Sequence, residues 1–251
     1  MTQTFSQALS RQDKVASWLQ SSVGMLLLEA ERAPLEKVLA PLFGSYLLHY
    51  SPCTAELPKP ANLRYTLRLT PAGGGGDILC AEGAWPIEPY GMDAVVLQHA
   101  LDFAQNPHQL LREAALSVRA GGHLVIVGIN PWSSWGLTHL WARDGLGEAH
   151  CLSAKRVQDW LKLLGFALEK RELGCYRPPL ANLGWQQRLE RCEPFAQRRQ
   201  LPGAGFYLLV ARKLMLGARP PRPSVRQPLG VLLPAPAVKL SARTVEEHFG
   251  N

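Results

Sequence analysis

Two short runs of consecutive apolar residues mark the middle of the chain. Residues 94–97 read Ala-Val-Val-Leu after Asp93, and residues 124–127 read Leu-Val-Ile-Val. Unbroken apolar runs of this length are typical of strands that are buried on both faces of a sheet. The pattern therefore predicts two buried strands in this region.

The stretch between these runs has helical spacing. Apolar residues recur from Leu110 to Val118 at intervals that place them on one face of a helix. Asn106, followed by Pro107, predicts the start of this helix, and the pair Gly121-Gly122 predicts its end, because glycine adopts the left-handed conformation of a helix cap without strain. A strand, a helix and a strand in succession predict parallel strands joined by a right-handed crossover.

The rest of the chain divides in the same way. Residues 11–41 have a helical pattern, with Glu29, Glu31 and Arg32 as its polar side. The other elements that the pattern predicts are strands at 45–52 and 62–71, a third strand that begins at 77, helices at 133–144 and 153–165, a strand at 167–176, a helical insertion at 177–197 and a last strand at 203–213. Alternating strands and helices predict a doubly wound α/β fold with a mostly parallel sheet.

The central motifs resemble a known family. Asp93-Ala-Val-Val, Leu111-Arg-Glu and Arg119-Ala-Gly-Gly-His-Leu-Val-Ile are similar to the fourth strand, the helix and the fifth strand of class I methyltransferases that use S-adenosylmethionine (SAM), in the type 11 branch. Ala120 stands where that branch usually has proline. The similarity extends from about Leu47 to Lys213, and it implies a Rossmann-like sheet of seven strands with an antiparallel last strand.

The end of the chain has a different composition. From Leu214 onward the sequence is rich in proline and has no periodicity, so we expect a methyltransferase-like domain at 1–213 and a disordered basic tail at 214–251. Five basic residues against two acidic ones give this tail +3 of the chain's net charge of +7. The basic charge is compatible with contact to nucleic acid or to an anionic membrane, but a solvated tail is favoured because no aromatic residues alternate with its charges.

The composition bears on metal binding, membrane insertion and cellular location. The five cysteines are scattered without a CxxC pair, which favours reduced thiols in the cytoplasm and argues against a zinc site. No two histidines are four residues apart, so we expect no metal site. The longest apolar runs are too short to cross a bilayer, and we expect no membrane span. The N-terminal residues lack the apolar segment of a secretion signal.

The resemblance implies a SAM site at the carboxyl ends of the first strands. A methyltransferase has a glycine-rich turn after strand one, and acids after strands two and three that bind ribose and adenine. Here the loop 53–60 contains no glycine, and Arg68 and Ala81 occupy the two acidic positions, with Glu82 one residue further on. The glycine run 73–76 precedes a strand and opens no helix, so it is a loop. We expect a weak or degenerate SAM site formed by His49, Ser51, Arg68, Glu82 and Gln98.

The candidate for catalysis is His99, directly after the fourth strand. A neutral imidazole there could remove a proton from the methyl acceptor; the alternative is a histidine that caps or lines the start of the next helix. Gln98 could instead orient the substrate. Trp132, Trp135 and Trp141 could cover an apolar substrate pocket or pack in the core.

Two classes of function follow. The first is a SAM-dependent methyltransferase acting on an unidentified acceptor. The second is a catalytically silent protein of the same fold that binds a protein or nucleic-acid partner.

Overall fold

The computed structural model describes residues 2–52, 56–60, 62–71, 76–179 and 203–215. The predicted insertion at 177–197 therefore lies outside the described residues from position 180 onward, and the tail at 214–251 lies outside them from position 216 onward. By its internal contacts the chain divides into Met1–Ala218 and Arg219–Asn251, and only the first unit contains described residues.

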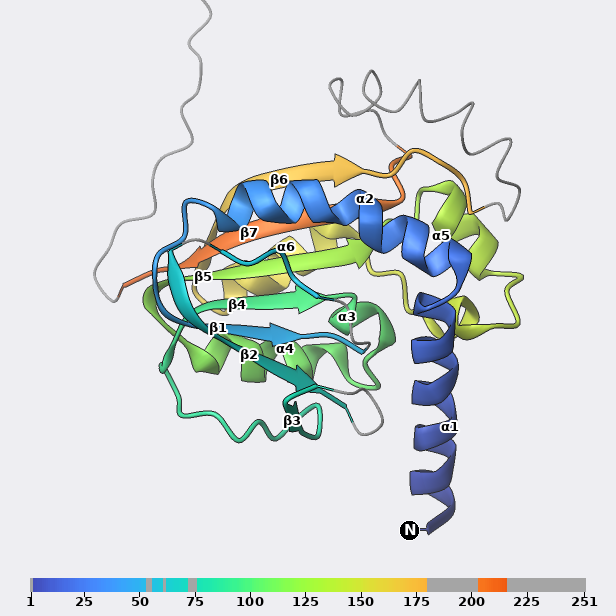
Figure 1. Ribbon diagram of the computed structural model, residues 1–251, viewed down its shortest axis with the longest axis horizontal. Helices are drawn as coiled ribbons and strands as arrows, with labels where there is room; N and C mark the ends of the chain where they lie inside the picture. The colour runs from blue at the N-terminus through green and yellow to red at the C-terminus, as the bar shows by residue number, and fades with distance from the viewer. Residues whose placement is uncertain (1, 53–55, 61, 72–75, 180–202, 216–251) are drawn as a thin grey trace, which may run out of the picture. The chain divides into compact units, whose positions relative to one another are not determined.

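The first unit is built on a sheet of seven strands in the order β3-β2-β1-β4-β5-β7-β6 (Figure 1). Strands β1 to β5 pair in parallel, and β7 runs antiparallel to both of its neighbours. The predicted α/β fold with a mostly parallel sheet and an antiparallel last strand is confirmed. The strands are β1 Gly44–Tyr50, β2 Leu63–Thr70, β3 Ile78–Leu79, β4 Met92–Gln98, β5 Val118–Ile129, β6 Phe166–Gly174 and β7 Phe206–Lys213.

Helices cover both faces of this sheet. Helix α2 (Ser22–Leu39) lies in front of it in Figure 1, and α4 (Pro107–Ser117) and α6 (Ala154–Leu163) lie behind it. Each face has its own apolar cluster, to which β4 contributes alternate residues: Val96 belongs to the α2 side and Val95 to the α4 side. This burial on both faces explains why the whole of β4 is buried.

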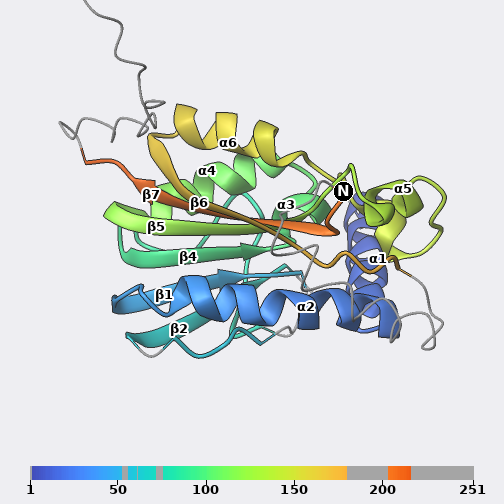
Figure 2. The same cartoon turned by 90° about the horizontal axis from the view of Figure 1, so that it is seen from above.

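The remaining helices lie at the edge where the parallel strands end. Helix α1 (Thr2–Leu19) crosses this edge, together with the short helices α3 (Ala100–Phe103) and α5 (Ser134–His139) and the 3-10 helix η1 (Gly145–Glu148) (Figures 1 and 2). The helix predicted over 11–41 is thus two helices, and the one predicted over 133–144 is much shorter. Ser21 caps α2 by accepting a hydrogen bond from Gly24 N.

Helices are missing where strict alternation would place them. Between β1 and β2, and between β2 and β3, the described residues contain no helix. Parallel strands need a crossover of about a dozen residues, which usually forms a helix; here the first crossover spans residues 51–62. The third strand is likewise only two residues long, because the chain turns back at an Ala81–Ala84 bridge.

The prediction that Gly121 and Gly122 cap α4 is wrong. The helix ends at Ser117, and both glycines belong to the start of β5, where the pairing with β4 shifts in register. Gly121 has a φ of +78°, a conformation that glycine adopts without strain. A Cβ on Gly122 would lie 2.7 Å from the Asp93 carbonyl oxygen, so the close approach of the two strands requires glycine there.

Candidate functional site

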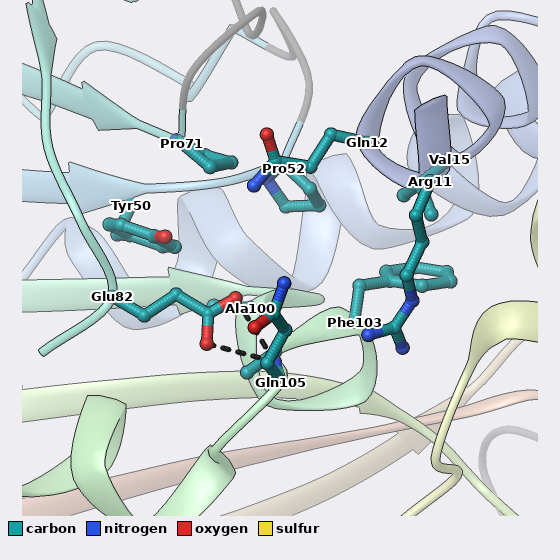
Figure 3. A pocket seen from close by; sticks show the side chains of 11 residues that line it. Arg11, Gln12, Val15, Tyr50, Pro52, Pro71, Glu82, Ala100, Phe103 and Gln105 are labelled. Carbon is teal, nitrogen blue, oxygen red and sulfur yellow. Dashed lines mark hydrogen bonds between the residues drawn. The ribbon is translucent and has the colours of Figure 1, made fainter. Parts of the chain in front are cut away.

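A hollow opens where β1, β2 and β4 end. Its enclosed space is about 20 Å³, room for about one water molecule and far below the roughly 300–1,000 Å³ of a small-molecule site, so a ligand would bind here only if the walls moved apart. Tyr50 and Pro52 line it from the end of β1, Pro71 from the end of β2, and Ala100 and Phe103 from α3 (Figure 3). This is the position at which a doubly wound sheet binds its ligands.

Glu82 is the acidic side chain of this hollow. Its carboxylate accepts hydrogen bonds from the backbone N–H groups of Gln105 (2.8 and 3.0 Å) and Asn106 (3.2 Å), and it faces the cavity from the segment after β3 (Figure 3). A carboxylate has about four acceptor sites. Glu82 can therefore hold the entry to α4 in place and still accept a bond from a ligand, and it is the sequence-predicted cofactor residue that lies in the hollow.

Tyr50, which lines the hollow together with Glu82, is held by an aromatic partner. The ring of Tyr50 stacks on that of Trp85 with centroids 5.2 Å apart and an angle of 11° between the ring planes. Ser51 follows Tyr50 and is buried, and its backbone N–H donates to the Leu69 carbonyl at 3.3 Å. Bulky side chains thus occupy the end of β1, where a glycine turn would let a ligand approach the backbone closely.

Arg68 does not line the hollow. Strand β2 continues two residues beyond it to Thr70, and Arg68 pairs in register with His49. Its guanidinium forms an ion pair with Asp77 at 3.0 Å, and that partner raises the pKa of the already cationic arginine and lowers the pKa of the Asp77 carboxyl. Arg68 was expected at the position of the ribose-binding acid; in the structure it lies two residues before the end of β2 and outside the hollow.

Helix α1 forms one wall of the hollow. Arg11, Gln12 and Val15 line it from this helix (Figure 3), and the Arg11 guanidinium anchors the helix through an ion pair with Glu148 of η1 at 3.0 Å. One turn further on, the ring of Trp18 packs against Phe103 with centroids 5.9 Å apart. The hydrophobic spacing predicts this helix but gives no sign of where it docks.

The other predicted site residues belong to a buried polar chain next to the hollow. Gln98 joins His49 to Glu31: its Oε1 lies 3.2 Å from His49 Nε2, and its Nε2 donates to Glu31 Oε2 at 2.8 Å. The second Glu31 oxygen lies 2.6 Å from His99 Nε2, and His99 Nδ1 lies 3.0 Å from Asp102. All five side chains are buried.

This arrangement fixes the charge of His99. Burial alone would lower its pKa, but the charge of Glu31 and the hydrogen bonds to Asp102 and Glu31 raise it to about 10. Both ring nitrogens then donate to carboxylates, so the imidazole has no lone pair with which to accept a proton. The expectation of a neutral His99 acting as a general base is wrong, and the alternative of a histidine that holds the helix start describes it better. Burial instead lowers the pKa of His49 to about 4.

Glu31 is the residue that the sequence interpretation missed. It was expected on the polar side of its helix, whereas its side chain is fully buried. A signal was present: Glu31 lies four residues after Leu27 and four before Leu35, both of which are buried. A carboxylate within an apolar stripe indicates a buried partner, since an unpaired buried charge is costly.

The three tryptophans take different positions. Trp135 is fully buried, and its Nε1 donates to the Arg177 carbonyl at 2.7 Å, so it packs in the core. Trp132 and Trp141 are exposed, and neither lines the hollow. Together they do not cover a substrate pocket. Among the described residues, no group of three or more His, Cys, Asp or Glu side chains could hold a metal ion.

Several solved structures similar to this chain are SAM-dependent methyltransferases. The chain is similar to such an enzyme from Thermotoga maritima (14% identity, 78% of this chain and 93% of that chain, TM-score 0.56) and to one from Mesorhizobium loti (17% identity, 74% and 100%, TM-score 0.51). It is also similar to a Haloferax volcanii protein, assigned as a methyltransferase, that was solved in complex with the activator Trm112 (13% identity, 80% and 98%, TM-score 0.55). At these identities the likeness shows the fold.

A curated relative is the uncharacterized protein YafS of Escherichia coli, with 29% identity over 143 residues, which is 54% of this chain. The match covers 60% of the length of that relative. No family model matches the chain. In the described part of the chain, no helix is long and apolar enough to cross a membrane.

Proposed function

We propose that this chain is a SAM-dependent methyltransferase that binds SAM in the hollow at the ends of β1, β2 and β4. The observation that carries the proposal is the hollow itself, which lies where this fold binds ligands and has a carboxylate, Glu82, facing into it. That carboxylate can accept a hydrogen bond from the ribose or adenine part of the cofactor.

The hollow has fewer features suited to binding SAM than the resemblance implies. Tyr50 stands where close backbone approach is needed, and α1 lies over the mouth with Arg11 and Gln12. Binding therefore requires α1 to move, and we expect a dissociation constant on the order of ten micromolar or weaker. His99 lies between two carboxylates and is not available as a general base. Catalysis would then depend on the alignment of the acceptor, the methyl group and the sulfur. An acceptor that is already nucleophilic needs no general base.

Calorimetry with SAM and with S-adenosylhomocysteine tests this proposal. We expect both to bind the wild-type protein, and Glu82→Gln to weaken binding by about tenfold or more, since a hydrogen bond to a charged group contributes about 1.5–3 kcal/mol. Glu88→Gln is the matched control, because Glu88 is exposed in the same segment and does not line the hollow. Equal affinities for both variants would place SAM elsewhere.

The second candidate is a catalytically silent protein of this fold that binds a partner. It is favoured by the absence of a helix among the described residues between β1 and β2, and by the position of His99 between Glu31 and Asp102. A protein partner is a proposal of the same kind, prompted by the Haloferax neighbour solved with its activator. If neither SAM nor S-adenosylhomocysteine binds the folded wild-type protein, this candidate becomes the better description.

A further inference from the structure

A second cavity lies where the crossover from β1 to β2 passes over the sheet. Its volume is about 550 Å³, within the roughly 300–1,000 Å³ of small-molecule sites. Residues 56–60 line it on one side, and His49 of β1 and Arg64, Thr66 and Arg68 of β2 line it on the other. The three β2 residues alternate along the strand and therefore share one face of the sheet. We call this space the crossover cavity.

The crossover cavity follows from the course of the chain above the sheet. A helix that packs on a sheet covers it with a cylinder about 10–12 Å across. Residues 56–60 contain no helix, so this part of the crossover covers the strands with less material. The face of β1 and β2 beneath it carries polar and charged side chains, which an apolar helix would not match.

His49 places a buried hydrogen-bond acceptor in the crossover cavity. Its side chain is 2% exposed, and burial keeps the ring neutral by lowering its pKa to about 4. Gln98 Nε2 donates to Glu31, so the amide oxygen of Gln98 faces His49 Nε2 at 3.2 Å. An amide oxygen only accepts, so Nε2 carries the ring proton and Nδ1 holds a lone pair. No described residue donates to Nδ1, which leaves it able to accept from a ligand.

The charged side chains of the crossover cavity leave one positive charge in excess. Arg68 is matched by Asp77, which accepts from its guanidinium at 3.0 and 3.3 Å. Lys59 and Arg64 are exposed and form no ion pair with any described residue. Glu56 is the acid among the described lining residues. Two cations without an ion pair against one acid favour an anionic ligand.

We propose that the crossover cavity binds a small phosphorylated polyol, such as a sugar phosphate, with its phosphate at Lys59 and Arg64 and a hydroxyl that donates to His49 Nδ1. A phosphomonoester carries about −1.5 to −2 charges at pH 7, which matches two cations, and arginine can bind it through two parallel hydrogen bonds. The hydroxyl is required because a fully ionised phosphate has no proton to donate to Nδ1. No described residue lines both this cavity and the hollow, so the proposal does not depend on SAM binding.

Nucleic acid fits the crossover cavity less well. His49 is almost fully buried, so only a small group can reach its Nδ1. Proteins that bind duplex DNA through its backbone commonly contact about 6–10 phosphates, far more than Lys59 and Arg64 can hold. Both arguments favour a small molecule.

Calorimetry of the full chain tests the proposal, with ribose 5-phosphate, ribose and inorganic phosphate as probes. We expect ribose 5-phosphate to bind at least about tenfold more tightly than ribose or inorganic phosphate, because only the whole molecule makes both kinds of contact. Arg64→Gln should weaken its binding by about tenfold or more. Arg112→Gln is the matched control, because Arg112 is exposed on α4 and does not line the cavity.

Nitrogen NMR of His49 provides a second measurement, which attraction to surface charge alone would not change. A hydroxyl that donates to Nδ1 should shift the signal of this unprotonated nitrogen when ribose 5-phosphate is added. No binding, equal binding of inorganic phosphate, an equal loss in Arg112→Gln or an unchanged His49 signal at saturation would overturn the proposal. Displacement of ribose 5-phosphate by SAM would assign the cavity to the cofactor and would overturn it as well.

Discussion

The interior of the protein holds a charged histidine between two acids. His99 lies 2.6 Å from Glu31 and 3.0 Å from Asp102, and all three side chains are buried. Such a triad does not by itself make a protein more stable than an apolar core would. Breaking it, however, leaves an uncompensated buried charge. His99 is therefore expected to matter for stability and for the position of α2.

The first prediction concerns Glu31. Glu31→Gln keeps the size of the side chain but removes the charge that faces His99, so the free energy of unfolding should fall by about 3–5 kcal/mol. Urea denaturation measures it. Glu29→Gln is the control, because Glu29 is exposed on the same helix and should change stability by less than about 0.5 kcal/mol. Similar losses in both variants would contradict the role of the triad.

The second prediction concerns pH. The pKa of His99 is raised from 6.5 to about 10 in the folded protein, so between these values the folded state binds a proton that the unfolded state lacks. Its contribution to stability is fully present below about pH 6.5 and is lost as the pH rises through about 10. In nitrogen NMR at about pH 8, where an ordinary histidine is neutral, both ring nitrogens of His99 should be protonated.

The His99 signal can be assigned by its loss in His99→Gln. If that variant does not fold, specific labelling of histidine in the wild-type protein still shows whether any ring is doubly protonated at this pH. Among the buried histidines His49 is the internal contrast, since burial lowers its pKa to about 4 and it should be neutral there. A spectrum with no doubly protonated histidine would show that a carboxylic acid, and not the imidazole, carries the proton.

At the scale of elements, the position of α1 depends on its tight corner with α2. A Cβ on Gly24 would lie 2.4 Å from the Trp18 carbonyl oxygen and 2.6 Å from the Leu19 Cα, both of which are backbone atoms. Only a glycine permits this approach, and the approach directs α1 across the hollow.

The third prediction follows from this corner. Gly24→Ala must separate the two helices, and we expect a loss of about 1–3 kcal/mol in unfolding free energy, as for other overpacked contacts. Ser22→Ala, at an exposed position of the same corner, should have little effect. If α1 controls access to the hollow, Gly24→Ala should also bind S-adenosylhomocysteine more tightly than the wild type does. A variant with unchanged stability would show that the corner can relax without cost.

Some elements could be predicted from the sequence because local patterns determine them. Helix α4 begins at its Asn106 cap as expected, with Asn106 Oδ1 accepting from Gln109 N, and α6 begins at the Ser153 cap. That the described residues between β1 and β2 contain no helix could not be predicted by counting alternations. Two signals were available in this crossover: it is short, and it contains Pro58 and Pro60, which disfavour a helix.

At the scale of the molecule, the sheet follows from the sequence more directly than the site does. Buried strands have continuous apolar runs that identify them, whereas the site depends on where α1 docks and which residue ends β2. Both are tertiary features: a shift of two residues separates the expected position of Arg68 from the observed strand end at Thr70. The edge of the sheet that carries the hollow could be predicted, because it depends on strand direction alone.

The last prediction concerns the boundary of the folded unit. Lys213 Nζ donates to the carbonyls of Ala115 and Val118 at 2.6 and 2.8 Å, and Leu214 N donates to the Gly165 carbonyl at 2.9 Å. A chain truncated after Met215 keeps all three bonds, so its melting temperature should equal that of the full chain. This expectation extends the domain two residues beyond the boundary at 213 that composition suggested.

Truncation after Arg212 provides the matched comparison. It removes the same tail and, in addition, the three hydrogen bonds that fasten the end of β7 to α4, β5 and the turn before β6. At about 0.5–1.5 kcal/mol for each bond, and more for bonds to the charged lysine, its melting temperature should fall by several degrees. Differential scanning calorimetry measures both chains. An equal, large decrease in both would mean that residues beyond 215 contribute to the folded unit, since only those residues are absent from both chains.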